Sequence, residues 1–365
     1  MAKRSTDARI SALVFFVSMT AGLLLLEGFV RAVFWNQVDT RSLEARPAAA
    51  SVVPFIRRSA DPDLLYELKP GVRLIGWGGI RVETDSSGCR VAPGSRDADS
   101  GPPRIAVVGD SSPFGWKVPF EATYGEQLRL RLQRALGKPV AVKNYSVPGY
   151  NSLQNLATFR DKVLRWHPDL LLLHYDNNDA DPSDDDRTRY MDPAYGDNIL
   201  HSMLLKFVVR RWHERATRMT VVVGADAAHP ERLYEGYRYE GPQFEFHMRQ
   251  MKAIADLAAA RGIPVVVFLW NPWLTRTAEP ESDPFYTLLH RPVSRRLRGF
   301  GYRVVDSYPL YQEFMRKNRL ADLQSLWNGP DDAHPSAEGH RVIAGFLYPT
   351  VLGLLRATAP ERPRS

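Results

Sequence analysis

The sequence contains one cysteine, Cys89, in 365 residues, so an intramolecular disulfide is excluded. A lone thiol does not reveal the redox compartment, and we expect Cys89 to pack as a small apolar residue. The usual metal-site patterns are also missing: the chain has no Cys-x-x-Cys, no His-Glu-x-x-His and no EF-hand loop. A Walker loop is absent as well, so these patterns imply no metal site.

The chain has little excess of charge of one sign. Lys and Arg number 48 and Asp and Glu 41, which gives a net charge of +7. No zinc-finger, RNA-recognition or helix-turn-helix signature accompanies this excess. We therefore interpret the basic residues as solvated faces and expect no nucleic-acid partner.

An apolar segment lies close to the N-terminus. Residues 10–26 carry no charge and are almost wholly apolar, a length at the lower limit for a helix that crosses a bilayer. Lys3 and Arg4 precede it, as in a secretory signal peptide, but no small-x-small cleavage site follows it closely. Residues 1–35 are thus predicted to be a membrane anchor, with a cleaved signal sequence as the alternative, and the following domain is predicted to be periplasmic or extracellular.

The rest of the chain divides at about residue 100. Residues 36–100 are predicted to form a linker and a small β-rich segment, and residues 101–358 one domain in which strands alternate with helices. Such alternation predicts an α/β fold with a parallel sheet covered on both faces. Residues 179–241 interrupt the alternation and are expected to form an insertion beside the site. The predicted strands of the sheet are 105–108, 140–145, 169–175, 265–270 and 302–305.

A Gly-Asp-Ser-Ser turn follows the first of these strands. Strand ends at this edge of an α/β sheet are where ligands bind, so the hydroxyl of Ser111 is placed to be a nucleophile. A serine needs a base and a group that orients the base. His334 is the candidate base, and Asp331 can reach its ring from the same loop. The neighbouring Ser112 is the less favoured candidate for the nucleophile.

A serine nucleophile also requires donors for the negative charge that develops on the carbonyl oxygen. The backbone amides of Ser111 and Gly149 are candidates for this oxyanion hole. A side-chain amide after the third strand, on Asn177 or Asn178, is the third candidate.

These residues resemble the conserved blocks of the SGNH (GDSL-type) hydrolase superfamily, and the chain is identified as a membrane-anchored bacterial member. In the third block Asp176 replaces the family's glycine, which keeps Asn177 open beside Asn178. The α/β-hydrolase elbow Gly-x-Ser-x-Gly is absent. The matching positions are Gly109-Asp110-Ser111 with Gly115, then Gly149, then Asn178 with Asp179, and finally Asp331 with His334.

The resemblance implies a flavodoxin-like three-layer α/β/α fold with a five-stranded parallel sheet. It also implies a Ser-His-Asp mechanism through an acyl-enzyme, without a cofactor, in which Asn178 is an oxyanion donor. With the anchor, it predicts an ester hydrolase acting on an O-acyl ester of a glycan, lipid or small molecule at the cell envelope.

Two other functions remain open. An O-acyltransferase, for example an acetyltransferase, that modifies a cell-surface polysaccharide would use the same acyl-enzyme with a sugar hydroxyl as the acceptor. A catalytically inactive glycan-binding envelope protein would use only the scaffold. The sequence leaves the acceptor and the oligomeric state undetermined.

Overall fold

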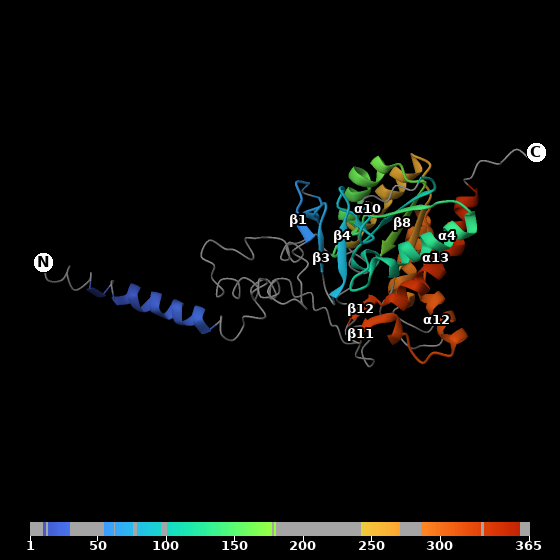
Figure 1. Cartoon of the computed structure of the whole chain (residues 1–365). Coiled ribbons are helices and arrows are strands. Elements are labelled where there is room, and N and C mark those ends of the chain that lie inside the picture. Colours follow the sequence, from blue (N-terminus) through green and yellow to red (C-terminus); the bar gives the residue numbers. More distant parts are fainter. Residues whose placement is uncertain are drawn as a thin grey trace, which may run out of the picture.

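The computed structural model describes residues 10–11, 14–29, 55–61, 63–75, 79–95, 101–176, 179, 242–270, 286–329 and 332–357 (Figure 1). Three site candidates lie outside these residues: Asn177, Asn178 and Asp331. The predicted insertion lies outside them as well, except for residue 179.

Five parallel strands form the centre of the fold, as predicted. Their order across the sheet is β7-β6-β8-β9-β10, which in chain order is 2-1-3-4-5, the flavodoxin-like arrangement. The strand order reverses between β6 and β8, and the loops that follow these two parallel strands lie at the carboxyl edge of the sheet. The strands are β6 (Arg104–Val108), β7 (Ala141–Asn144), β8 (Leu170–Tyr175), β9 (Val265–Leu269) and β10 (Arg303–Asp306).

The sheet does not end at β7, which corrects the expectation of a purely parallel sheet. Three short strands continue it to eight in the order β7-β5-β4-β3, and all three pairings are antiparallel. The sheet is therefore mixed. The β-rich segment before the domain forms hydrogen bonds with it directly, through β3 (Arg73–Ile75), β4 (Arg81–Thr84) and β5 (Arg90–Val91).

A separate hairpin precedes these strands. Strands β1 (Ile56–Arg58) and β2 (Tyr66–Leu68) pair antiparallel in a two-stranded sheet of their own. Phe55, Tyr66 and Leu68 are buried together with Phe114 and Tyr150, which follow β6 and β7. The hairpin thus packs near the carboxyl ends of two central strands.

Each central strand sends alternate side chains into two cores, because successive residues of a strand face opposite sides of the sheet. In β6, Ala106 and Val108 enter one core and Ile105 and Val107 the other. Burial on both faces accounts for the apolar run Leu170–Leu173, in which every side chain is 0% exposed.

Helices cover both faces, with α10 and α13 on opposite sides of the sheet (Figure 1). The first core is covered by α5 (Ser152–Thr158), α10 (Pro242–Ala259) and α11 (Arg291–Gly299), and the second by α4 (Tyr124–Leu136), α12 (Ser307–Asn318) and α13 (Ala337–Ala357). Cys89 lies in the first core, where burial raises the pKa of its thiol to about 12. This burial confirms its expected role as a packed small residue.

Near the N-terminus, residues 10–11 and 14–29 have helical backbone. Within the described part of the chain, no helix has both the length and the apolar character needed to cross a membrane. Residues 1–9, 12–13 and 30–35 of the predicted anchor lie outside that part.

Candidate active site

Ser111 is the first residue of a four-residue helix, α3 (Ser111–Phe114), which begins directly after β6. The carboxylate of Asp110 caps this helix by accepting the backbone N–H of Ser112 at 3.0 Å. Glycine is required at position 109, because a Cβ there would lie 2.8 Å from the Cβ of His174. The strand can therefore turn sharply and place Ser111 at the carboxyl edge of the sheet.

The structure brings Ser111 and His334 together across 223 positions of the sequence. Ser111 Oγ lies 2.8 Å from His334 Nε2, the geometry of a hydroxyl and the base that activates it. Ser112, the alternative serine, is only 2% exposed. Ser111 is thus the serine of this turn that lies within hydrogen-bonding reach of a histidine.

His334 is held from two directions. It lies in β12 (Asp332–Pro335), which pairs antiparallel with β11 (Trp327–Gly329). The indole of Trp116 stacks on its imidazole, with ring centroids 5.4 Å apart and an interplanar angle of 23°. In a triad the other ring nitrogen, Nδ1, binds the orienting carboxylate. Asp331, expected in that role, lies outside the described residues.

A buried arginine that sequence reasoning did not identify holds the segment after Ser111. Arg90 of β5 is 1% exposed, and its guanidinium donates to the carbonyls of Phe114 and Gly115 at 2.7 Å and of Val118 at 2.8 Å. Gly115 has φ +87°, and a Cβ there would lie 2.7 Å from Arg90 Nη1. Glycine is needed where the backbone approaches the guanidinium this closely.

Two asparagines complete this set of donors. Asn144 of β7, paired in register with Arg90, donates its side-chain amide to Pro113 O at 2.7 Å. Asn328 of β11 donates to Trp116 O at 3.0 Å. Carbonyls at the end of a short helix lack partners within the helix, and these side chains supply them. No local sequence signal marks these donors, since each comes from a strand distant in sequence.

The loop after β7 contains the second candidate oxyanion donor, Gly149. The backbone N–H of Tyr150 donates to Val147 O at 3.1 Å, and Gly149 has φ +82°. Proline followed by a glycine of positive φ defines a type II turn, here Val147-Pro148-Gly149-Tyr150. The turn is attached to the segment that leads into Ser111, because Val147 N–H donates to Gly109 O at 3.1 Å.

The loop after β8 is held by Asp179. Its carboxylate accepts the backbone N–H of Asp176 at 2.8 Å and the side-chain amide of Asn155 at 2.9 Å. Its own N–H donates to Asp176 O at 3.1 Å. Asn177 and Asn178 lie outside the described residues, so the choice between them stays a prediction.

Behind Ser111 lies a buried polar cluster of Asp110, His174 and Asp176. Carboxylate oxygens of the two aspartates and a ring nitrogen of His174 lie within 4.8 Å of one another, a ligand set that could hold a metal ion. Burial lowers the pKa of His174 to about 4, although Asp110 acts in the opposite direction. A neutral imidazole beside the carboxylates is therefore expected at neutral pH.

His340 is buried next to this cluster and acts as a structural acceptor. Its Nδ1 accepts the backbone N–H of Tyr124, the first residue of α4, at 3.1 Å, and the Tyr124 hydroxyl lies 3.2 Å from His174 Nδ1. His340 is 0% exposed, and its Nε2 has no hydrogen-bonding partner among the residues that the structure describes. Burial, assisted by the positive charge of Arg90, lowers the pKa of His340 to about 3.

This burial predicts a loss of stability in mild acid. Between pH 6.5 and about 3 the unfolded chain binds a proton at His340 that the folded chain does not, so stability falls as the pH falls. His340→Asn keeps an acceptor near the position of Nδ1 and removes the titration. The slope of unfolding free energy against pH should become shallower, by up to about 1.4 kcal/mol per pH unit, in urea titrations from pH 7 to 4.

The matched control is His167→Asn. His167 is exposed and has φ +51°, a left-handed conformation that asparagine tolerates. Its slope should match that of the unmodified protein. Equal slopes for His340→Asn and the unmodified protein would contradict the expected acid sensitivity.

The family model that matches this chain is that of the GDSL-like lipase/acylhydrolase family, over residues 107–342, more than half of its length. The chain belongs to this family. As a GDSL-like acylhydrolase it is an ester-hydrolysing enzyme. A search of curated protein sequences gave no significant match.

Solved structures similar to this GDSL-like acylhydrolase include TesA, at 16% identity over 69% of this chain and 99% of that chain, with a TM-score of 0.41. The acetyl xylan esterase AlAXEase is 14% identical over 68% of this chain and 99% of its own, with a TM-score of 0.41. A lipase/acylhydrolase from Enterococcus faecalis is 14% identical over 68% and 95%, with a TM-score of 0.40.

Proposed function

We propose that this acylhydrolase cleaves an O-acyl ester through an acyl-enzyme formed on Ser111. The observation that carries the proposal is the 2.8 Å contact between Ser111 Oγ and His334 Nε2 at the carboxyl edge of the sheet. Ser111 Oγ attacks the ester carbonyl while His334 accepts its proton, and Asp331 orients the imidazole. His334 then protonates the leaving alcohol. Water, activated by the same histidine, attacks the acyl-enzyme and releases the carboxylic acid.

The charge on the carbonyl oxygen is stabilised by the backbone amides of Ser111 and Gly149 and by the side chain of Asn178. Support comes from the proximity of their loops, since the turn that contains Gly149 is hydrogen-bonded to Gly109. Donors fixed in this way stabilise the tetrahedral intermediate more than the planar substrate.

Alanine substitution at Asn177 and at Asn178, separately, identifies the side-chain donor. Asn178→Ala should lower kcat by about 100- to 1000-fold, because one preorganised donor is lost. Asn177→Ala should have the smaller effect and is the matched control. The assignment is reversed if Asn177→Ala shows the large loss in steady-state hydrolysis of p-nitrophenyl acetate.

A fluorophosphonate probe tests the proposed function as a whole. The folded protein should be labelled at Ser111, located by mass spectrometry of its peptides, and should release acetate from p-nitrophenyl acetate. Adding a polysaccharide acceptor tests transfer: acetylated polysaccharide in place of free acetate would indicate an O-acyltransferase. If the protein resists the probe under conditions that label a known serine esterase, the catalytic proposal fails and the glycan-binding alternative gains support.

We further propose that the enzyme acts at the cell envelope, attached through its N-terminal segment. Support comes from the described helical residues there, whose large apolar side chains are exposed, such as Phe15 at 63% and Leu25 at 77%. Exposed apolar side chains gathered in this way favour contact with lipid. Labelling with the probe after cell fractionation should recover the protein in membranes, and recovery in the soluble fraction alone would contradict the proposed location.

A further inference from the structure

The hairpin β1–β2 lies against two segments of the candidate active site, α3 after β6 and the Gly149 turn after β7. Phe55 at its start stacks on Phe114 of the nucleophile helix, with ring centroids 5.7 Å apart and an interplanar angle of 15°. Tyr66 in β2 packs against Tyr150 with centroids 5.3 Å apart. The hairpin precedes residues 107–342, the segment that the family model matches. Its contacts with the site are therefore a feature that the family match does not include.

Two hydrogen bonds join Tyr66 to the turn that contains Gly149. The Tyr66 hydroxyl donates to Pro148 O at 2.9 Å, and the Tyr150 hydroxyl donates to Tyr66 O at 2.5 Å. Tyr66 is 2% and Tyr150 1% exposed, so water does not compete strongly for either bond. Tyr66 thus bonds to the residue on each side of Gly149.

The hydrogen bond from the Tyr66 hydroxyl to Pro148 O holds the peptide group between Pro148 and Gly149. Pro148 C=O and Gly149 N–H belong to one trans peptide unit, in which the carbonyl and the amide point in opposite directions. Type I and type II turns differ in the orientation of this central peptide. A hydroxyl that holds Pro148 O towards the hairpin therefore directs Gly149 N–H to the side away from the hairpin.

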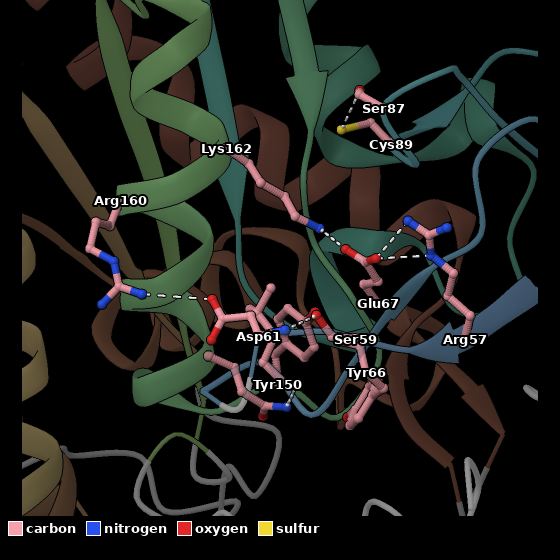
Figure 2. A network of polar contacts seen from close by, with 12 residues as sticks. Arg57, Ser59, Asp61, Tyr66, Glu67, Ser87, Cys89, Tyr150, Arg160 and Lys162 are labelled. Atoms are coloured by element: carbon pink, nitrogen blue, oxygen red, sulfur yellow. Dashed lines mark hydrogen bonds and ion pairs between the residues drawn. The ribbon is translucent and has the colours of Figure 1, made fainter.

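The hairpin itself is fixed, so Tyr66 is a rigid support. Gln154 of α5 donates to Leu64 O at 2.7 Å. Glu67, next to Tyr66, accepts from Lys162 at 2.6 Å and from Arg57 at 2.9 Å (Figure 2). These ion pairs lower the pKa of Glu67 against the effect of its burial, so the carboxylate stays charged. Figure 2 shows Tyr66 and Tyr150 close to this network.

We propose that Tyr66 is a positioning residue for catalysis: its hydroxyl fixes the Pro148–Gly149 peptide so that Gly149 N–H is an oxyanion donor. The inference rests on the proposed function, since it assigns a task to the oxyanion loop. It also gives the N-terminal hairpin a part in the reaction, which Tyr66 plays through the backbone of the loop that contains Gly149.

Tyr66→Phe tests this inference, because it removes the hydroxyl and keeps the ring in its packed position. With p-nitrophenyl acetate, kcat should fall by about 10-fold, the effect of one hydrogen bond, while KM stays within about twofold. Affinity for phenylboronic acid, whose serine adduct places an oxygen in the oxyanion hole, should fall in parallel with kcat. Labelling at Ser111 should persist, because the nucleophile and its base are unchanged.

Tyr302→Phe is the matched control. The Tyr302 hydroxyl also donates to a buried backbone carbonyl, that of Met251, but Tyr302 lies just before β10, at the amino end of the strand and away from the site. It should lose stability comparably while keeping kcat and boronate affinity. If Tyr66→Phe has the kinetics of Tyr302→Phe, the inference is overturned and the proposed function stands. If the unmodified protein neither reacts with a fluorophosphonate nor hydrolyses the ester, both are overturned.

Tyr150→Phe keeps the test decisive if Tyr66→Phe does not fold. It removes the bond that holds the Tyr66 backbone and leaves the bond to Pro148 O in place. We expect a smaller fall in kcat, about threefold, again with KM unchanged. A folded Tyr150→Phe protein with unchanged kcat would overturn the inference in that case.

Discussion

Ser111→Ala should lower kcat for ester hydrolysis by at least about 10⁴-fold and abolish labelling by a fluorophosphonate. The variant removes the oxygen that lies 2.8 Å from His334 Nε2 and leaves no hydroxyl in its place. Its fold should persist, because Ser111 is only partly buried and belongs to none of the three hydrophobic cores. Circular dichroism and a thermal melt check the fold, and steady-state hydrolysis of p-nitrophenyl acetate measures kcat.

Ser112→Ala is the matched control from the same turn. Ser112 is buried, and its backbone N–H, which the substitution keeps, binds the Asp110 carboxylate. This variant should still be labelled. Combining Ser111→Ala with His334→Ala should cost little more than Ser111→Ala alone, because the two groups act as one unit. Labelling that survives in Ser111→Ala, or disappears only in Ser112→Ala, would move the nucleophile to the neighbouring serine.

Arg90→Met should produce the largest loss of stability, about 3 kcal/mol in the free energy of unfolding. The substitution takes the donors away from three backbone carbonyls at and beyond the end of α3, those of Phe114, Gly115 and Val118. The loss is partly offset because a buried charge is removed: burial already lowers the pKa of Arg90 to about 10. Urea denaturation at neutral pH measures the difference.

Arg341→Met is the control for this variant. Arg341 forms an exposed ion pair with Glu338 on α13, and its loss should cost less than about 1 kcal/mol. Arg90→Lys should lie between the two, since an ammonium group keeps the charge but cannot reach three carbonyls with the geometry of a guanidinium. Equal denaturation midpoints for Arg90→Met and Arg341→Met would show that the loop after Ser111 is held by other contacts.

The central sheet could be predicted from the sequence because its strands are buried on both faces. Complete burial gives short apolar runs, such as Leu170–Leu173, that are visible without any knowledge of their neighbours. Leu128, Leu132 and Leu136 recur at helical spacing in the sequence, and all three lie in α4 (Tyr124–Leu136), which ends at Gly137 with φ +63°. The pairing of Ser111 with His334 was also predicted, from the chemistry that a serine requires.

The antiparallel part of the sheet could not be predicted in the same way. Strands β3, β4 and β5 have two to four residues each, too few for a periodic pattern. Their position in the sheet depends on backbone pairing with the edge of the parallel strands at β7, as between Arg90 and Asn144. Backbone hydrogen bonds do not require particular side chains, so the sequence pattern does not reveal them. The expectation of a purely parallel sheet was wrong for this reason. The roles of Asp331, Gly149 and Asn178 stay predictions.

By itself the sequence determined the α/β class, the positions of the central strands along the chain and the residue types that a serine hydrolase needs. These properties follow from local patterns: apolar runs, helical spacing, and polar residues directly after strands. The tertiary structure alone decided what holds those residues in place. Arg90, Trp116 and Tyr66 act on the backbone and rings of the site from distant or unpatterned positions. Such contacts depend on which chain segments meet in space, and that is fixed only when the whole sheet has formed.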